Sequence, residues 1–109
     1  MHRKPVGDGL HEMLPGVRMT TLVHGERTLL AEFRLDAGAV VPLHRHPYEQ
    51  TGYLVAGRMT FTVAGDRFDA VPGSSWSIPL DVEHGAEVVE DSVVIEVFSP
   101  VRDDYLPLT

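Results

Sequence analysis

The sequence contains no cysteine and few basic residues, and each shortage excludes several classes of function. Without cysteine the chain has no disulfide, no thiolate metal site and no cysteine nucleophile. Its 9 lysines and arginines stand against 16 aspartates and glutamates, which gives a formal net charge of −7. Because an acidic chain repels phosphate backbones and anionic lipid, we expect no nucleic-acid partner and no membrane association.

Long apolar runs are missing as well. The longest is Tyr53-Leu54-Val55-Ala56, which is far too short to span a membrane. No apolar stretch follows the basic start of the chain, so we expect no signal peptide and a cytoplasmic location. The 109 residues are enough for a single domain, 1–109, with one hydrophobic core.

Turn-forming residues are plentiful, with 10 glycines and 8 prolines spread between short apolar runs. Residues 58–63 alternate between polar and apolar side chains, which predicts a half-buried strand followed by a hairpin turn. Residues 29–35 form a second strand candidate. Residues 86–99 are rich in valine and isoleucine and predict strand, with another hairpin turn at 90–92. Many short strands around a small core favour an all-β barrel or jelly roll.

Three of the six histidines have a spacing typical of metal ligands. His44 and His46 are two residues apart, so in a strand both would point to one side and reach one ion. His84 lies 38 residues further on. Either Glu49 or Gln50 is a candidate fourth ligand, and only Gln50 shares the parity of the first two histidines. Imidazoles without thiolates suit transition metals rather than Ca or Mg.

Two spaced patterns resemble the two sequence motifs of the cupin superfamily. The second motif normally has glycine where this chain has Asp81, and the first normally has glutamate where this chain has glutamine. The 15 residues between the patterns, 58–72, match the short spacing of small bacterial cupins. The positions that carry the resemblance are Gly38, His44, His46, Gln50 and Gly57 in the first pattern and Gly73, Pro79 and His84 in the second.

This resemblance implies a double-stranded β-helix, the jelly-roll barrel of cupins, over residues 26–100. Residues 1–15 would then form an N-terminal arm and residues 101–109 a C-terminal tail. It also implies one divalent transition metal in the mouth of the barrel, with Ni, Zn, Mn and Fe all compatible. The implied metal ligands are His44, His46, Gln50 and His84.

Gln50 in place of glutamate changes the charge of the implied site. Three imidazoles and one amide are neutral, so they leave the +2 charge of the ion uncompensated. We therefore expect a strong Lewis acid that attracts anionic ligands. Since non-haem iron oxygenases more often use a carboxylate ligand, the glutamine favours proton transfer over oxygen chemistry.

A closer resemblance is to the pectin-degradation cupins, and it rests on residues 44–54 and 94–106. Those cupins open the ring of 4,5-unsaturated monouronates to linear keto acids, at a metal held by three histidines and one glutamine. An Asp, a Phe and an Arg line their site. The corresponding residues here are Glu96, Phe98 and Arg102, of which Glu96 departs from the family by one methylene.

The resemblance implies a role for each of these residues. Glu96, facing inward, would be a buried carboxyl with a raised pKa suited to proton transfer. Arg102 would bind a substrate carboxylate, and Phe98 would contact the substrate. Apart from the resemblance, Tyr53 shares a strand face with Val55, and we expect it to form a hydrogen bond with a substrate hydroxyl. The alternatives are an outward-facing Glu96, a Phe98 that only packs in the core, and an Arg102 paired with a neighbouring aspartate at the surface.

Three functions remain open at this point. The first is a metal-dependent enzyme of lyase or isomerase type that acts on a sugar-acid-like anion by proton transfer. The second is a cupin dioxygenase using Fe(II), and the third is a barrel that binds a small molecule without catalysis. We also expect a homodimer, because an open jelly roll of this size leaves strand edges to be covered.

Overall fold

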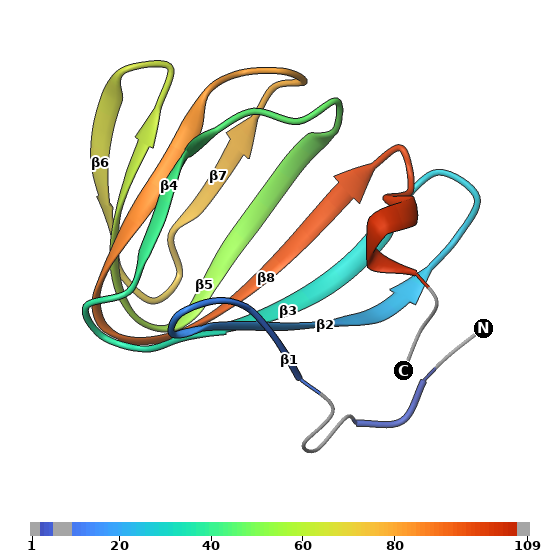
Figure 1. Cartoon of the computed structure of the whole chain (residues 1–109), viewed down its shortest axis with the longest axis horizontal. Coiled ribbons are helices and arrows are strands. Elements are labelled where there is room, and N and C mark those ends of the chain that lie inside the picture. The colour runs from blue at the N-terminus through green and yellow to red at the C-terminus, as the bar shows by residue number, and fades with distance from the viewer. Residues whose placement is uncertain (1–2, 6–9, 107–109) are drawn as a thin grey trace.

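The computed structural model describes residues 3–5 and 10–106, and these are built almost entirely from strands (Figure 1). One short 3-10 helix, η1 (Asp103–Tyr105), follows the last strand. The strands are β1 (His11–Leu14), β2 (Val17–His24), β3 (Leu29–Leu35), β4 (Val40–His44), β5 (Glu49–Val63), β6 (Asp66–Ala70), β7 (Ser75–Ile78) and β8 (His84–Ser99).

The two longest strands, β5 and β8, pair antiparallel from Glu49↔Ser99 to Val63↔His84. β3 and β7 pair with one half of this long ladder, whereas β4 and β6 pair with the other half. Each long strand therefore takes part in two sheets that face each other, as Figure 1 shows. This is the arrangement of a double-stranded jelly roll, and the predicted all-β fold class is confirmed.

β5 changes which of its side chains point inward. Gln50 and Leu54 are buried at even positions, whereas Met59 and Phe61 are buried at odd positions. The change occurs around Gly57, where φ is 97° and the pairing with β8 shifts register. A bulge of this kind inserts an unpaired residue and reverses the alternation. Even-numbered positions such as Gln50 point inward before the bulge, and odd-numbered positions of 58–63 point inward after it. The two predicted alternations are therefore both correct, each on its own half of the strand.

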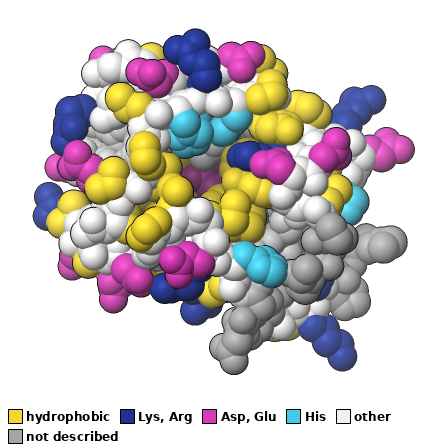
Figure 2. All heavy atoms as spheres, in the orientation of Figure 1, with side chains coloured by type: hydrophobic (Ala, Val, Ile, Leu, Met, Phe, Trp, Pro, Cys, Tyr) yellow, Lys and Arg dark blue, Asp and Glu magenta, His cyan; other side chains and the backbone are white. Residues whose placement is uncertain are grey.

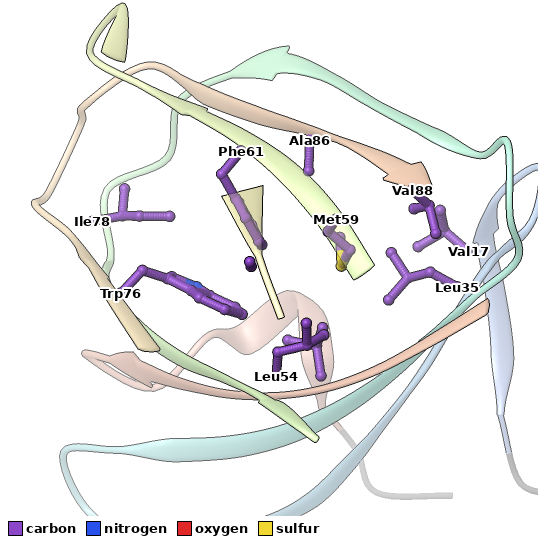
Figure 3. Packing of buried hydrophobic residues seen from close by; sticks show 11 residues of the cluster. Val17, Leu35, Leu54, Met59, Phe61, Trp76, Ile78, Ala86 and Val88 are labelled. Carbon is purple, nitrogen blue, oxygen red and sulfur yellow. The ribbon is translucent and has the colours of Figure 1, made fainter. Parts of the chain in front are cut away.

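The apolar side chains of the two sheets meet between them and form the core of the barrel (Figure 3). Phe61 packs on the indole of Trp76, with ring centroids 4.3 Å apart. Leu54 and Ile78 are completely buried beside them. Some of these side chains, among them Met59 and Phe61, also line the cavity of the site, which lies where the end of β4 pairs with the start of β8.

The two predicted hairpin turns have different outcomes. The turn after residue 63 is confirmed, because Ala64 and Gly65 both adopt positive φ, as a two-residue hairpin requires. The turn at 90–92 is wrong, because β8 continues through these residues without interruption. Ser92 is buried there, where its hydroxyl accepts from the backbone N–H of Arg58 at 3.1 Å and donates to Glu90 O at 2.7 Å. These polar residues therefore hold the bulge of β5 rather than a turn.

The sheet extends further toward the N-terminus than the predicted 26–100. β2 pairs with β3, and β1 pairs with β2, so part of the predicted arm at 1–15 is strand. In the predicted tail at 101–109, the chain turns back through η1, and residues 107–109 lie outside the described part. Among the described residues, none forms a helix with the length and apolar character needed to cross a membrane.

Replacing Gly57 by alanine tests the bulge in β5. A Cβ at Gly57 would lie 2.2 Å from Ser92 Oγ, whereas nothing lies within 4 Å of a Cβ at Gly65, which has a similar φ. We expect Gly65→Ala to lower the free energy of unfolding by about 1 kcal/mol through backbone strain alone. Gly57→Ala should lower it by at least about 3 kcal/mol, because a steric clash is added. Equal losses in urea denaturation would contradict this account of β5.

Candidate metal centre

Three histidines from different segments converge at the open end of the barrel and form what we call the histidine cluster: His44, His46 and His84. One ligand atom from each lies within 4.8 Å of the others. His44 ends β4 and pairs in register with His84 at the start of β8, and their ring centroids are 4.3 Å apart. His46 lies in the connection between β4 and β5. Strand alternation therefore does not account for His46, and the loop conformation brings it to the cluster.

Backbone carbonyls orient two rings of the histidine cluster. His44 Nδ1 lies 2.9 Å from Pro42 O, and His84 Nδ1 lies 2.9 Å from Val82 O. Because a carbonyl only accepts, each Nδ1 carries the proton and donates it, which leaves Nε2 as the free ligand atom. Burial lowers the pKa of His84 to about 4, and the hydrogen bond with Val82 O opposes this fall only in part. This ring is therefore neutral at pH 7, as metal binding requires.

The structure brings Gln50, and not Glu49, into the cluster. Gln50 is buried at the start of β5, whereas Glu49 is exposed. Gln50 Oε1 lies 2.9 Å from His46 Nε2. Two ligands at right angles on one ion, each about 2.1 Å from it, are separated by about 3.0 Å. The contact therefore has the spacing of two ligands of one ion as well as that of a hydrogen bond.

The donor set fits a divalent transition metal. The hydrogen bonds of His44 and His84 to backbone carbonyls leave Nε2 of each ring free, ligand atoms of the three rings converge, and the amide oxygen of Gln50 lies beside His46. His46 Nδ1 is buried and has no hydrogen-bond partner among the described residues. Three imidazoles and one amide oxygen suit Ni, Zn, Mn or Fe better than Ca or Mg.

Glu96 faces the cavity from β8, so the outward-facing alternative is wrong. Its side chain is buried, with a relative exposure of 4%. Burial raises the pKa of Glu96 to about 8, and hydrogen bonds from Gln50 and Trp76 oppose that rise in part. The indole N–H of Trp76 donates to Glu96 Oε1 at 3.3 Å. At neutral pH Glu96 is therefore a protonated acid beside the histidine cluster.

A glycine makes room for this carboxyl. Gly52 on β5 is paired with Trp76 on one side and with Glu96 on the other. A Cβ at Gly52 would lie 2.2 Å from Trp76 Nε1 and 2.4 Å from Glu96 Oε2. Gly52 is a site residue that our sequence analysis missed. The available signal was a glycine inside a strand pattern, which often marks a close approach of other groups.

Arg102 reaches back over the cavity from the tail. Its guanidinium carbon lies 3.9 Å from the ring centroid of Tyr105, 4.8 Å from that of Tyr48 and 4.9 Å from that of Phe98. Nε and Nη2 donate to Asp104 at 3.1 and 2.7 Å. Arg102 thus forms the predicted ion pair with a neighbouring aspartate, and it also lines the cavity. Asp104 takes two of the five N–H donors, so others can bind an anion.

The remaining predicted contacts divide between the two faces of the sheet. Phe98 is 1% exposed, lines the cavity and packs in the core, so both of its predicted roles are compatible with its position. Tyr53 is 49% exposed on the outer face of β5, and the structure does not bring it to the cavity.

Asp81 adopts a left-handed φ of 60°, which explains why the cupin motif that this segment resembles normally has glycine there. Aspartate is among the few other residues that tolerate this conformation.

These groups surround a cavity of about 420 Å³. In Figure 2 histidine side chains lie at the rim of a hollow, acidic atoms lie at its floor, and apolar side chains surround it. Glu96 is the one acidic residue among the described residues that line the cavity. The site therefore combines neutral metal-ligand groups, one buried acid and one arginine in an otherwise apolar recess.

A jelly-roll barrel with histidines and a glutamine at its open end is typical of the cupin class. Residues 31–99 match the cupin domain, and the chain belongs to this family. It is similar to the pectin degradation protein KdgF of Dickeya dadantii, with 25% identity over 97 residues that cover 87% of this chain and 88% of KdgF. The structure of KdgF from Halomonas sp. has 33% identity and a TM-score of 0.85, covering 89% of this chain and 90% of that one.

A second relative is H2HPP isomerase of Bacillus subtilis, with 27% identity over 93 residues that cover 84% of this chain. This chain spans only 39% of the length of that protein. The predicted membership of the cupin superfamily and the resemblance to pectin-degradation cupins are both confirmed.

Glu96 should give the metal-free protein a distinctive dependence of stability on pH. Between the ordinary glutamate pKa of 4.5 and the folded value of about 8, the folded chain keeps a proton that the unfolded chain has lost. The free energy of unfolding therefore falls as pH rises, by up to about 1.4 kcal/mol per pH unit. His84 acts in the opposite direction, but only between about pH 4 and 6.5.

We expect denaturation in a chelator to show this loss of stability between pH 7 and 8 in the wild type. Glu96→Gln should remove it and be the more stable protein at pH 8. Glu49→Gln, an exposed control at the start of β5, should keep the wild-type dependence of the free energy of unfolding on pH. If the free energy of unfolding changed with pH in the same way in the wild type and in Glu96→Gln, Glu96 would not be a buried neutral acid.

Proposed function

We propose that the protein is a metal-dependent enzyme that moves a proton on an anionic small molecule. The observation that carries this proposal is the buried, protonated carboxyl of Glu96 next to a convergent set of neutral metal ligands. The similarity to KdgF supports it, and ring opening and tautomerisation of an unsaturated uronate is the first candidate reaction.

A metal held by His44, His46, Gln50 and His84 would polarise an oxygen of the bound anion and stabilise the negative charge that develops there. Arg102 binds the substrate carboxylate through the N–H donors that Asp104 leaves free. The rings around its guanidinium, together with Asp104, fix the direction of these donors. A fixed orientation of the substrate contributes to the rate, because no further entropy is lost in the reaction step.

Glu96 carries the proton. In the ring opening of an unsaturated uronate, the bond between C1 and the ring oxygen breaks and the hemiacetal hydroxyl loses its proton. C4 gains a proton as the enolate becomes a ketone, so the reaction is an isomerisation without water or redox change. Glu96 donates one proton and takes the other back, which a group with a pKa near neutral does in both directions. The indole N–H of Trp76 stabilises the carboxylate that forms in between.

The other predictions from the sequence stay predictions. They are the Fe(II) dioxygenase, the barrel that binds without catalysis, the homodimer and the cytoplasmic location. Oxygen consumption in the same assays would distinguish the dioxygenase, because the proposed isomerisation consumes none.

Kinetics with a 4,5-unsaturated monouronate test the proposal, followed by the loss of ultraviolet absorbance of its conjugated double bond. We expect turnover that a chelator abolishes and added metal restores. Glu96→Gln should lower kcat by about a hundredfold or more, since it removes the proton carrier. Arg102→Lys should mainly raise KM, by about tenfold, because lysine lacks the planar pair of donors. Arg67→Lys, an exposed control, should match the wild type.

Two results would contradict the proposal. One is full activity of Glu96→Gln, and the other is the absence of metal-dependent proton exchange with both the unsaturated uronate and an apolar oxo acid such as phenylpyruvate.

A further inference from the structure

The cavity has a polar end and an apolar end, and the change between them is abrupt. Along β8, the inward position after His84 is Ala86, and the inward position before Glu96 is Val94. A step of two strand residues is about 6.6 Å, so the apolar wall begins one side chain away from the acid and the histidine cluster. On β4 the lining likewise changes from His44 to Val41.

Beyond this point the described lining is apolar on every strand that contributes to it. The residues are Leu14, Val17, Phe33, Leu35, Met59 and Phe61. None of these side chains can replace a hydrogen bond to water. A ligand hydroxyl buried against them would weaken binding by roughly tenfold or more.

The open side of this apolar end is bordered by an edge strand. All four residues of β1 are exposed, and among them Met13 and Leu14 line the cavity with exposures of 44% and 37%. Apolar side chains that border a recess gain free energy when a ligand removes them from water. At about 420 Å³ the recess is in the range of sites that hold drug-sized ligands.

We propose that the ligand of this cavity has two unlike ends. An anionic oxo-acid or enol-acid group lies at the histidine cluster and Arg102, and an apolar body of several carbons, branched or aromatic and without hydroxyls, fills the rest. The assignment of the anionic end rests on the proposed function, whereas the apolar body follows from the lining alone. Within the proposed proton-transfer chemistry, an apolar oxo acid should therefore bind more tightly than an unsaturated uronate, whose hydroxyls would face the apolar wall.

A series of acids that share one head group tests the apolar end separately from the polar end. Calorimetry on the zinc-loaded protein would compare pyruvate, 4-methyl-2-oxopentanoate and phenylpyruvate, with galacturonate as the hydroxyl-rich acid. Each buried methylene should tighten binding roughly fourfold, so we expect 4-methyl-2-oxopentanoate to bind at least about tenfold tighter than pyruvate. Phenylpyruvate should bind tighter than galacturonate, with a negative heat-capacity change.

Two neighbouring valines on β4 provide a matched pair of variants. Val41 lines the cavity, whereas Val40 is 54% exposed on the opposite face. Val41→Thr keeps the shape and adds a hydroxyl to the wall, so it should weaken phenylpyruvate binding by about three- to tenfold and leave pyruvate unchanged. Val40→Thr should change neither. Urea denaturation would verify that both variants fold.

Equal affinities along the series overturn the inference, as do tighter binding of galacturonate than of phenylpyruvate and a lack of binding by all four acids. If affinity rises with the apolar size of the acid but no metal-dependent proton exchange occurs, the proposed function is overturned instead. The inference that the cavity prefers an apolar body would then still hold. The two failures are therefore distinguishable in one set of samples.

Discussion

The antiparallel pairing of β5 with β8 along their whole lengths is the constraint on which the site depends. In one sheet this register sets Gln50 against Phe98 and Gly52 against Glu96. In the other sheet it sets Val63 against His84, at the opposite end of the same two strands. Because both strands cross from one sheet to the other, inward positions that are far apart in sequence meet in one recess. The positions of the histidine cluster, of Glu96 and of the apolar core therefore all depend on the pairing of β5 with β8.

A buried carboxyl is the least favourable feature of this arrangement, and its surroundings explain how it persists. Gly52 leaves the space, the Trp76 indole N–H and the Gln50 amide contact the carboxyl, and burial keeps it protonated. A neutral acid avoids most of the desolvation cost of a buried charge. The same burial makes Glu96 able to exchange a proton near neutral pH. Burial of Glu96 thus explains both why the carboxyl is tolerated in the core and why it suits the proposed proton transfer.

Local patterns in the sequence predicted more of the site than of the long-range structure. The alternation at 58–63 and the parity of Gln50 were both correct, since each depends on a few neighbouring residues. The reversal of parity at Gly57 and the unbroken course of β8 were not predicted, because both depend on how two distant strands pair. Tyr53 lies on the outer face because it occupies an odd position on the half of β5 where even positions such as Gln50 point inward. The apolar end of the cavity depends on six strands at once, and no single stretch of sequence indicates it.

The central proposal is that the three histidines and Gln50 hold one divalent metal, and that backbone carbonyls already fix the proton of His44 and of His84 on Nδ1. Nitrogen-15 NMR of the histidine rings during titration with Zn²⁺ tests it most directly. We expect the metal-free protein to have His44 and His84 protonated at Nδ1, and one equivalent of zinc to shift Nε2 of both, together with a ring nitrogen of His46 and the Gln50 side-chain amide. Rings protonated at Nε2, or no uptake of zinc, would contradict the account.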